Sequence, residues 1–184
     1  MKRLLVPAML LLLPGLALAT AQFPERLVYH GQEMFIFSEP LEYYFSEDHP
    51  RPRVFEEGGM CTACWRGYVG TWKIEDGVLY LVALSDCGCG TEPREIPLSV
   101  VFPDQAPPIK AEWYSGVLRV PQGEQLMYVH MGYASQYERD LLIRVEKGRV
   151  VREVVIDNTL KTKDELYENM HKSPEEMLRE AAPQ

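Results

Sequence analysis

The sequence predicts a mainly β protein, an antiparallel sandwich or open barrel that ends in short C-terminal helices. Short runs of Val, Ile, Leu, Tyr and Phe recur from Phe23 to Asn158, with clusters of Gly, Pro and Asp between them, which is the pattern of successive strands. No segment with helical periodicity lies between these runs, which favours antiparallel pairing over βαβ units. Hydrophobic residues make up 46% of the chain and charged residues 25%, as in ordinary globular domains.

The first expected hairpin turns at Asp76-Gly77, a pair that can take the positive φ values of a type I′ turn. This turn sets Ile74 opposite Leu79, and further along the ladder Trp72 opposite Leu81, so one face is apolar. In chain order the expected strands are Leu27–Tyr29, Glu33–Phe37, Tyr68–Ile74, Val78–Leu84, Ile96–Val101, Gly116–Val120, Gln125–His130, Asp140–Glu146 and Val150–Ile156.

A second hairpin is expected to turn at Lys147-Gly148, with Glu146 opposite Arg149 at its mouth. Its apolar face should hold Ile143, Val145, Val150 and Val154. Cross-strand pairs contribute only about 0.2–1 kcal/mol each, so the buried face matters more than the charge pair.

Two helix starts follow the strands. Thr162 lies three residues before Glu165, and the run Ser173 to Glu176 places a proline at the first helical position and a glutamate at the third. We expect short helices over about Lys163–His171 and Pro174–Ala182.

The N-terminal segment 1–21 has the features of a secretory signal peptide: a basic start, an apolar run and small residues at the end, with cleavage after Ala19 or Ala21. Pro7 and Pro14 interrupt the run, which disfavours a membrane-spanning helix, and no transmembrane anchor is expected after cleavage. The chain is therefore predicted to comprise a signal peptide (1–21), a β domain (22–158) and a helical tail (159–184), and to be periplasmic or secreted.

The formal net charge is −8 and the sequence pI is near 5.1. Phosphate contacts need clustered Lys and Arg, so nucleic acid is not an expected partner.

Cys61, Cys64, Cys87 and Cys89 form a C-x-x-C pair and, 22 residues later, a C-x-C pair on either side of the first hairpin. An unbroken ladder would face Cys64 onto Cys89, with the other two sulfurs nearby. Three interpretations follow: two disulfides between the pairs, a four-thiolate zinc site, or a redox-active C-x-x-C. Export favours the disulfides, whereas a redox C-x-x-C normally opens a helix in a βαβ unit that is not expected here.

Aromatic residues gather in two parts of the sequence and could form a binding face, since Trp, Tyr and Arg stack on planar or sugar-like ligands. The alternative is core packing with tyrosine hydroxyls at the sheet edge. His130 lies in an apolar run and is expected to be a hydrogen-bonded core residue. The candidate face consists of Trp65, Arg66, Tyr68, Trp113, Tyr114, His130, Tyr133 and Tyr137.

Two segments resemble a recurrent bacterial module. The first is the W-R-G-Y-x-x-T-W-x-I run from Trp65 to Ile74, and the second is Trp113–Glu124 together with the Y-V-H-M-G-Y run Tyr128–Tyr133. The module occurs in uncharacterised bacterial proteins without an assigned activity. The resemblance therefore implies a bacterial source, transfers no catalytic residue, and implies that the cysteines are an adaptation to export.

These observations predict an exported, non-enzymatic binding or inhibitor-like module whose ligand is a protein or a cell-envelope component. The sequence contains no G-x-S-x-G elbow, no H-E-x-x-H and no phosphate-cradling loop. The main alternative is a zinc-binding or thiol-redox protein that uses the four cysteines. A hydrolase is the third, because catalytic groups can assemble from distant segments. No cofactor is expected unless the cysteines bind zinc.

Overall fold

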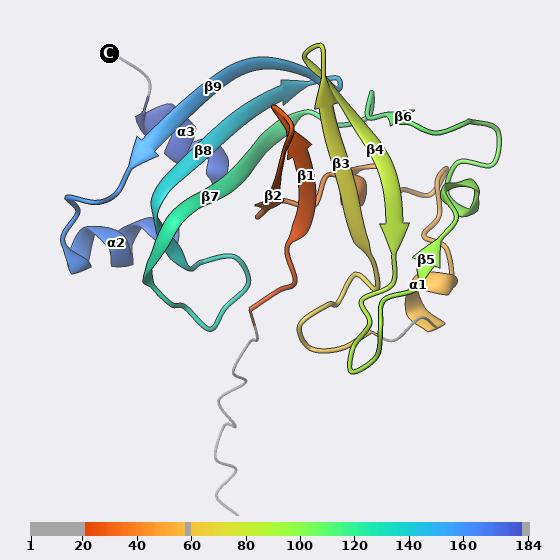
Figure 1. Cartoon of the computed structure of the whole chain (residues 1–184), viewed down its shortest axis with the longest axis horizontal. Coiled ribbons are helices and arrows are strands. Elements are labelled where there is room, and N and C mark those ends of the chain that lie inside the picture. The colour runs from red at the N-terminus through yellow and green to blue at the C-terminus, as the bar shows by residue number, and fades with distance from the viewer. Residues whose placement is uncertain (1–20, 58–59, 182–184) are drawn as a thin grey trace, which may run out of the picture.

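The structure, a computed structural model, describes residues 21–57 and 60–181, and its strands form one mixed sheet (Figure 1). Along the sheet the order is β2-β1-β3-β4-β9-β8-β7, with β5 and β6 paired to β4. The predicted mainly β, open architecture with short C-terminal helices is confirmed, whereas the predicted signal peptide lies almost entirely outside the described residues. The strands are β1 (Glu25–Tyr29), β2 (Gln32–Ile36), β3 (Val69–Glu75), β4 (Val78–Ser85), β5 (Glu95–Ile96), β6 (Ile109–Lys110), β7 (Gly116–Met127), β8 (Gln136–Glu146) and β9 (Arg149–Asp157).

One strand pair departs from the predicted antiparallel arrangement. β1 and β3 run parallel, with Leu27 opposite Trp72, whereas the other pairs are antiparallel. The cause is the long connection from β2 to β3, which contains a 3₁₀ helix, η1 (Pro40–Tyr43), and a short helix, α1 (Val54–Glu57). Since β2 already ends beside the start of β1, this connection carries the chain past β1 to its other edge, where β3 starts at the same end as β1 and so runs parallel to it. The connection also carries much of the site described below.

The sheet has two halves that curl around a common core (Figure 1). The β4 and β9 strands meet only at Val78 and Arg149. At the other side the Phe37 backbone N–H, just after β2, donates to the Arg119 carbonyl oxygen of β7 at 2.7 Å. The largest fully buried side chains are aromatic or aliphatic, and they include Trp72, Tyr68, Tyr114, Phe55, Phe102 and Leu27.

Both hairpin turns are confirmed. Asp76 and Gly77 have φ values of 50° and 71°, and the ladder pairs Ile74 with Leu79 and Trp72 with Leu81 as predicted. The positive φ at both central positions is what a type I′ turn requires, and Gly adopts it without strain.

The second hairpin turns at Lys147 and Gly148 and pairs Glu146 with Arg149, as predicted. The prediction that Val154 shares a face with Ile143 is wrong: Val154 pairs with Leu142 and packs in a second apolar cluster. The register shifts between Arg144 and Val145, and such an irregularity changes which side chains face each other.

Several predicted boundaries also differ. The expected strand Ile96–Val101 is only the short β5, followed by the 3₁₀ helix η2 (Leu98–Val100), because Pro97 cannot donate to a ladder. The two strands expected between Gly116 and His130 are largely one long strand, β7, which ends at Met127. His130 therefore lies beyond the sheet.

The C-terminal helices α2 (Lys163–Asn169) and α3 (Pro174–Glu180) both begin with the predicted capping boxes. Met177 and Leu178 of α3 pack against Val117 of β7 and Leu142 of β8, forming the second apolar cluster. Among the described residues, none of the helices has the length and apolar character needed to span a bilayer.

Candidate functional site

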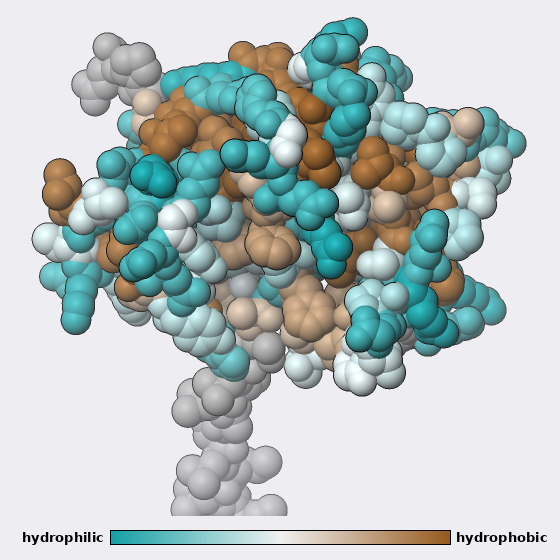
Figure 2. All heavy atoms as spheres, viewed as in Figure 1, coloured by the Kyte–Doolittle hydropathy of each residue, from teal (hydrophilic) through white to brown (hydrophobic). Residues whose placement is uncertain are grey.

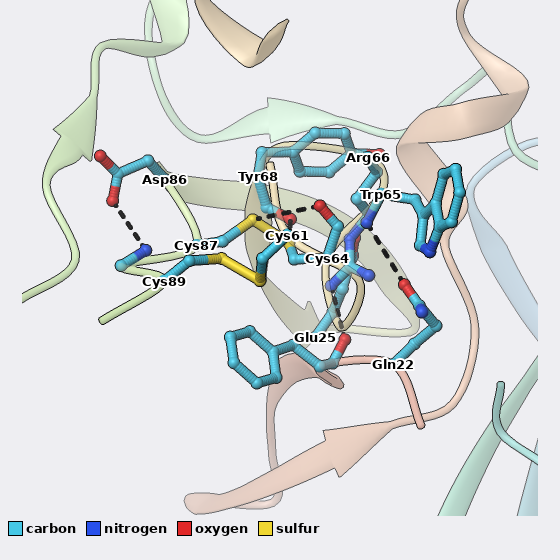
Figure 3. Close-up of a disulfide and its surroundings, with 12 residues drawn as sticks. Gln22, Glu25, Cys61, Cys64, Trp65, Arg66, Tyr68, Asp86, Cys87 and Cys89 are labelled. Atoms are coloured by element: carbon cyan, nitrogen blue, oxygen red, sulfur yellow. Dashed lines mark hydrogen bonds and ion pairs between the residues drawn. A yellow bond between two sulfur atoms is a disulfide. The ribbon is translucent and has the colours of Figure 1, made fainter. Parts of the chain in front are cut away.

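The four cysteines form two disulfides, Cys61–Cys89 and Cys64–Cys87 (Figure 3). Cross-links between the two pairs are thus confirmed, but Cys64 bonds Cys87 rather than facing Cys89. The ladder shifts register between Thr71 and Trp72. In addition, β3 begins only after Cys64 and β4 ends before Cys87, so the register cannot be extended to the cysteines.

The disulfides exclude the two alternatives for the cysteines, a zinc site and a redox-active dithiol, in this structure. All four sulfur atoms are bonded in pairs, so no thiolate is available for a four-cysteine zinc site. Within the described part of the chain, no other group of at least three His, Cys, Asp or Glu side chains could hold a metal ion.

The disulfides fix a tight loop that presents Trp65. The Cys64 backbone N–H donates to the Cys61 carbonyl at 2.8 Å, and the Gly67 backbone N–H donates to the Cys64 carbonyl at 3.3 Å. Gly67 has φ +73°, and a Cβ there would lie 1.7 Å from the Phe55 carbonyl oxygen, so only glycine fits. Trp65 itself is 71% exposed, and Figure 3 shows its ring pointing away from the sulfur atoms.

Arg66, the next residue, points inward and is buried. Its Nε lies 3.2 Å from Glu25 Oε1, and its Nη1 donates to Glu39 Oε1 at 3.2 Å. Its Nη1 also donates to the Tyr133 hydroxyl at 3.1 Å, and its Nη2 donates to the Phe23 carbonyl at 2.7 Å. One guanidinium therefore connects the disulfide loop to the chain before β1, to the segment after β2 and to the segment between β7 and β8.

Glu25 forms the innermost part of this cluster. Its side chain is fully buried, its Oε1 faces Arg66, and its Oε2 accepts a hydrogen bond from the Trp72 indole N–H. Burial raises the pKa of Glu25 from 4.5 to about 7, because the loss of hydration outweighs the attraction of Arg66 and the hydrogen bond from Trp72. The negative charges of Glu39 and Glu42 raise the pKa further.

This raised pKa makes stability depend on pH. The folded protein binds the Glu25 proton more tightly than the unfolded chain does, so the contribution of Glu25 is complete below pH 4.5 and is lost as the pH rises through about 7. We expect the loss to be about 3 kcal/mol relative to Glu25→Gln, because glutamine does not titrate. Urea unfolding of both proteins between pH 4 and 8 measures it; parallel profiles would contradict this prediction.

A second ion pair, between Arg51 and Glu42 of η1, lies next to the Arg66–Glu25 pair. Arg51 Nη1 donates to both carboxylate oxygens of Glu42, at 3.0 and 2.8 Å, and the Tyr68 hydroxyl donates to Glu42 Oε1 at 2.7 Å. Arg51 Nη2 also donates to the Arg66 carbonyl oxygen at 2.5 Å. The guanidinium lies 5.2 Å from the centre of the Phe45 ring, within the range of a cation–π contact.

The paired side chains of Glu39, Glu42, Arg51 and Arg66 form the floor of a cleft with a volume of about 380 Å³. The Trp65 indole stands at its rim, and Glu39 and Glu42 are each about one-third exposed, with 32% of the side chain accessible. The cleft is lined by Gln22, Glu39, Glu42, Arg51, Trp65 and Arg66. Gln22 holds the rim, since its Nε2 donates to the Thr62 carbonyl at 2.9 Å and its Oε1 accepts from the Trp65 backbone N–H at 3.4 Å.

The predicted face divides among several places. Trp65 and Arg66 line the cleft, while Tyr68 and Tyr133 hydrogen-bond to its charged groups. Tyr114 is a core residue. The remaining predicted residues lie elsewhere.

Trp113 packs on the core against Phe102, at 5.1 Å between ring centres. Tyr137 contacts Phe37 edge-on at 5.7 Å. The expectation that His130 is a core residue is wrong: it is exposed, and its Nδ1 lies 2.7 Å from the Tyr128 hydroxyl. Its apolar sequence neighbours suggested a strand that ends three residues earlier.

Sequence reasoning missed Gln22, Glu39, Glu42 and Arg51, which share no motif and come from three separate segments: the chain before β1, the start of η1 and the loop before α1. Their only local signal is the acidic pair around Pro40-Leu41, and acidic pairs are common on solvated surfaces. By contrast, the two segments that carry the bacterial resemblance meet in space, since Arg66 of the first contacts Tyr133 of the second.

A different apolar surface lies over β9. Val151 and Val155 are 53% and 55% exposed, and Figure 2 shows hydrophobic residues there among hydrophilic ones. Glu153 lies between the two valines and accepts a hydrogen bond from the Tyr29 hydroxyl. Scattered apolar side chains of this kind are normal on protein surfaces. The Trp65 cleft is therefore the better candidate site.

Comparison with known proteins finds no family model that matches the chain, and no curated protein or solved structure is significantly similar to it. The fold and the site define a disulfide-linked mixed β protein with a charged cleft beside an exposed tryptophan.

Proposed function

We propose that the protein is an exported, non-enzymatic binding module that holds its ligand in the Trp65 cleft. The observation that carries this proposal is the position of Trp65: a large aromatic side chain, 71% exposed, on a loop fixed by two disulfides. Exposed aromatic side chains on rigid supports lose little conformational entropy on binding, which is why they serve as anchors in recognition sites.

The two disulfides also support export. Such bonds form and persist in oxidising compartments, so they agree with the predicted signal peptide and a periplasmic or extracellular location. The rigid cross-linked loop and the internally paired charges behind it are typical of a site that is organised before its ligand arrives.

A hydrolase is the second candidate, because Glu39 and Glu42 bring two carboxylates to one cleft. Pairs of carboxylates perform glycoside hydrolysis in many enzymes. Here, however, Glu42 accepts two hydrogen bonds from Arg51, and Glu39 accepts from both Arg66 and Tyr133. Glu25, whose pKa is raised to about 7, is fully buried and lines no part of the cleft. Because Glu39 and Glu42 are held by hydrogen bonds within the protein and Glu25 is buried outside the cleft, the site favours binding over bond cleavage.

The proposal is tested with Trp65→Ala and a panel of four probes: a neutral oligosaccharide, an oligolysine peptide, a heparin oligosaccharide and phosphatidylglycerol vesicles. We expect at least one probe to bind the wild type in calorimetric titrations and to lose at least tenfold in affinity with Trp65→Ala. As a matched control, Tyr167→Ala removes another exposed aromatic residue, 58% accessible on α2, and should bind like the wild type.

Two results would contradict the proposal. One is that no probe binds up to millimolar concentration, and the other is that every bound probe binds Trp65→Ala as tightly as the wild type. Chromatography of the probes after incubation addresses the hydrolase: intact probes support a binding module, whereas shortened oligosaccharides would identify an enzyme.

A further inference from the structure

We infer that the ligand is a neutral oligosaccharide chain, which lies in the Trp65 cleft and continues past Gln22 into a second, aromatic hollow. This inference rests on the proposed binding function and gives it a ligand class. It combines the chemistry of the cleft lining with the position of the neighbouring hollow.

Positive and negative groups balance in the cleft. Its lining contains two carboxylates, two guanidinium groups and one primary amide, which together carry no net charge. Arg66 is buried and paired inside the protein, whereas the side chains of Glu39, Glu42 and Arg51 are 32%, 32% and 28% exposed and present polar atoms to a ligand. Neighbouring hydroxyls of a sugar ring both donate and accept hydrogen bonds, so they complement such a mixed lining.

The exposed indole of Trp65 also suits a sugar ring. The Trp65 face is apolar and flat, and the carbon-bound hydrogens of a sugar ring form a similarly flat, apolar face. Stacking at Trp65 would leave the ring's edge hydroxyls directed at the polar groups of the cleft. The volume of about 380 Å³ lies at the small end of the range for small-molecule sites, which suits one end of a chain rather than a large rigid ligand.

A second hollow, with a volume of about 420 Å³, shares Gln22 with the Trp65 cleft. Among the described residues, it is lined by no charged side chain and by several aromatic ones, including Phe35, Phe37, Tyr128 and Tyr137. Phe35 and Tyr128 are 56% and 59% exposed. A chain of sugar rings presents repeated apolar faces between hydroxyls, and it can therefore use an aromatic residue in each hollow.

Other ligand chemistries fit less well. A cationic peptide would meet Arg51 and Arg66 in the cleft, while an anionic glycan or phosphate would meet Glu39 and Glu42. A purely apolar segment would bury these charges without providing hydrogen bonds, which is unfavourable. A neutral ligand with many hydroxyls avoids all three penalties.

The test is a length series of β-1,4-linked glucose oligosaccharides, the dimer, tetramer and hexamer, titrated calorimetrically into the full-length mature protein. We expect the hexamer to bind at least tenfold more tightly than the dimer, since only the longer chain reaches the second hollow. Trp65→Ala should weaken binding of every length. Tyr128→Ala should weaken the hexamer and leave the dimer unchanged, and Tyr167→Ala should alter neither.

Each other outcome overturns the inference in a recognisable way. Equal affinity for dimer and hexamer, or equal effects of Tyr128→Ala on both, excludes the second hollow. Binding of oligolysine, heparin or vesicles through Trp65, with none of glucose oligosaccharides, overturns the ligand class and leaves the binding function intact. Failure of all probes overturns both. Thermal unfolding of each variant verifies that a loss of binding does not reflect a loss of folding.

Discussion

Replacing Arg66 with methionine should destabilise the protein by about 3–5 kcal/mol at pH 8, which is the typical effect of removing one member of a buried ion pair. The side chains of Arg66 and Glu25 are 3% and 0% exposed, so the variant leaves a buried carboxylate without its cation. At pH 5 the loss should be smaller, because Glu25, whose pKa is already raised to about 7, is then neutral. Urea unfolding at both pH values measures the difference.

Two further variants test whether the loss of stability comes from the buried ion pair. Glu25→Gln/Arg66→Met removes both charges and should recover much of the stability at pH 8. Arg144→Met removes an exposed ion pair with Glu146, whose side chains are 34% and 57% exposed, and should change stability by less than about 1 kcal/mol. If Arg66→Met is no more destabilising than Arg144→Met, then Arg66 does not hold the site together.

Removing both disulfides should destabilise the protein by about 6 kcal/mol, whereas removing either one should cost only about 2 kcal/mol. The two bridges are nested, with sequence separations of 28 and 23, so each one alone closes nearly the same loop. Breaking a single bridge therefore restores little chain entropy to the unfolded state. Denaturant unfolding of Cys61→Ser/Cys89→Ser, Cys64→Ser/Cys87→Ser and the combined variant measures the three values.

Treatment with a reducing agent is the control for these measurements. It should lower the stability of the wild type and leave the cysteine-free combined variant unchanged. Equal, additive losses from the two bridges would show that they do not constrain the same loop. Such a result would also weaken the argument that the bridges jointly fix Trp65.

Elements determined by local signals could be predicted from the sequence. The turns at Asp76-Gly77 and Lys147-Gly148 each need two consecutive positive φ values, which few residue pairs adopt, and they fix the pairing of the adjacent strands. The capping boxes at Thr162 and Ser173 likewise involve contacts only three residues apart. Because these signals act over a few residues, tertiary packing does not override them.

Features that depend on distant contacts could not be predicted. The register shift between Thr71 and Trp72 alters the alignment of the strands that lead to the cysteines, and nothing in the local sequence marks it. The parallel β1–β3 pair depends on the path of the long connection after β2.

For the same reason, only part of the candidate site could be predicted from the sequence. Trp65 and Arg66 belong to a recognisable motif, but Arg66 reaches Glu39 across 27 residues and Tyr133 across 67 residues. Glu39 and Glu42, the carboxylates that line the cleft beside Trp65, come from a segment without a recognisable motif. The sequence therefore identifies Trp65 as a candidate binding residue but does not reveal the cleft beside it.

A two-dimensional nuclear magnetic resonance titration of the ¹⁵N-labelled protein with the glucose hexamer locates the bound oligosaccharide on the protein. The protein has three tryptophans, of which Trp72 is fully buried, Trp113 is partly buried and Trp65 is 71% exposed, so their indole N–H signals report separate places. If the oligosaccharide lies in the Trp65 cleft, the signals of the Trp65 indole and the Gln22 side-chain amide should shift most and with a common affinity. Shifts confined to β9 or to the C-terminal helices, with the Trp65 signal unmoved, would contradict it.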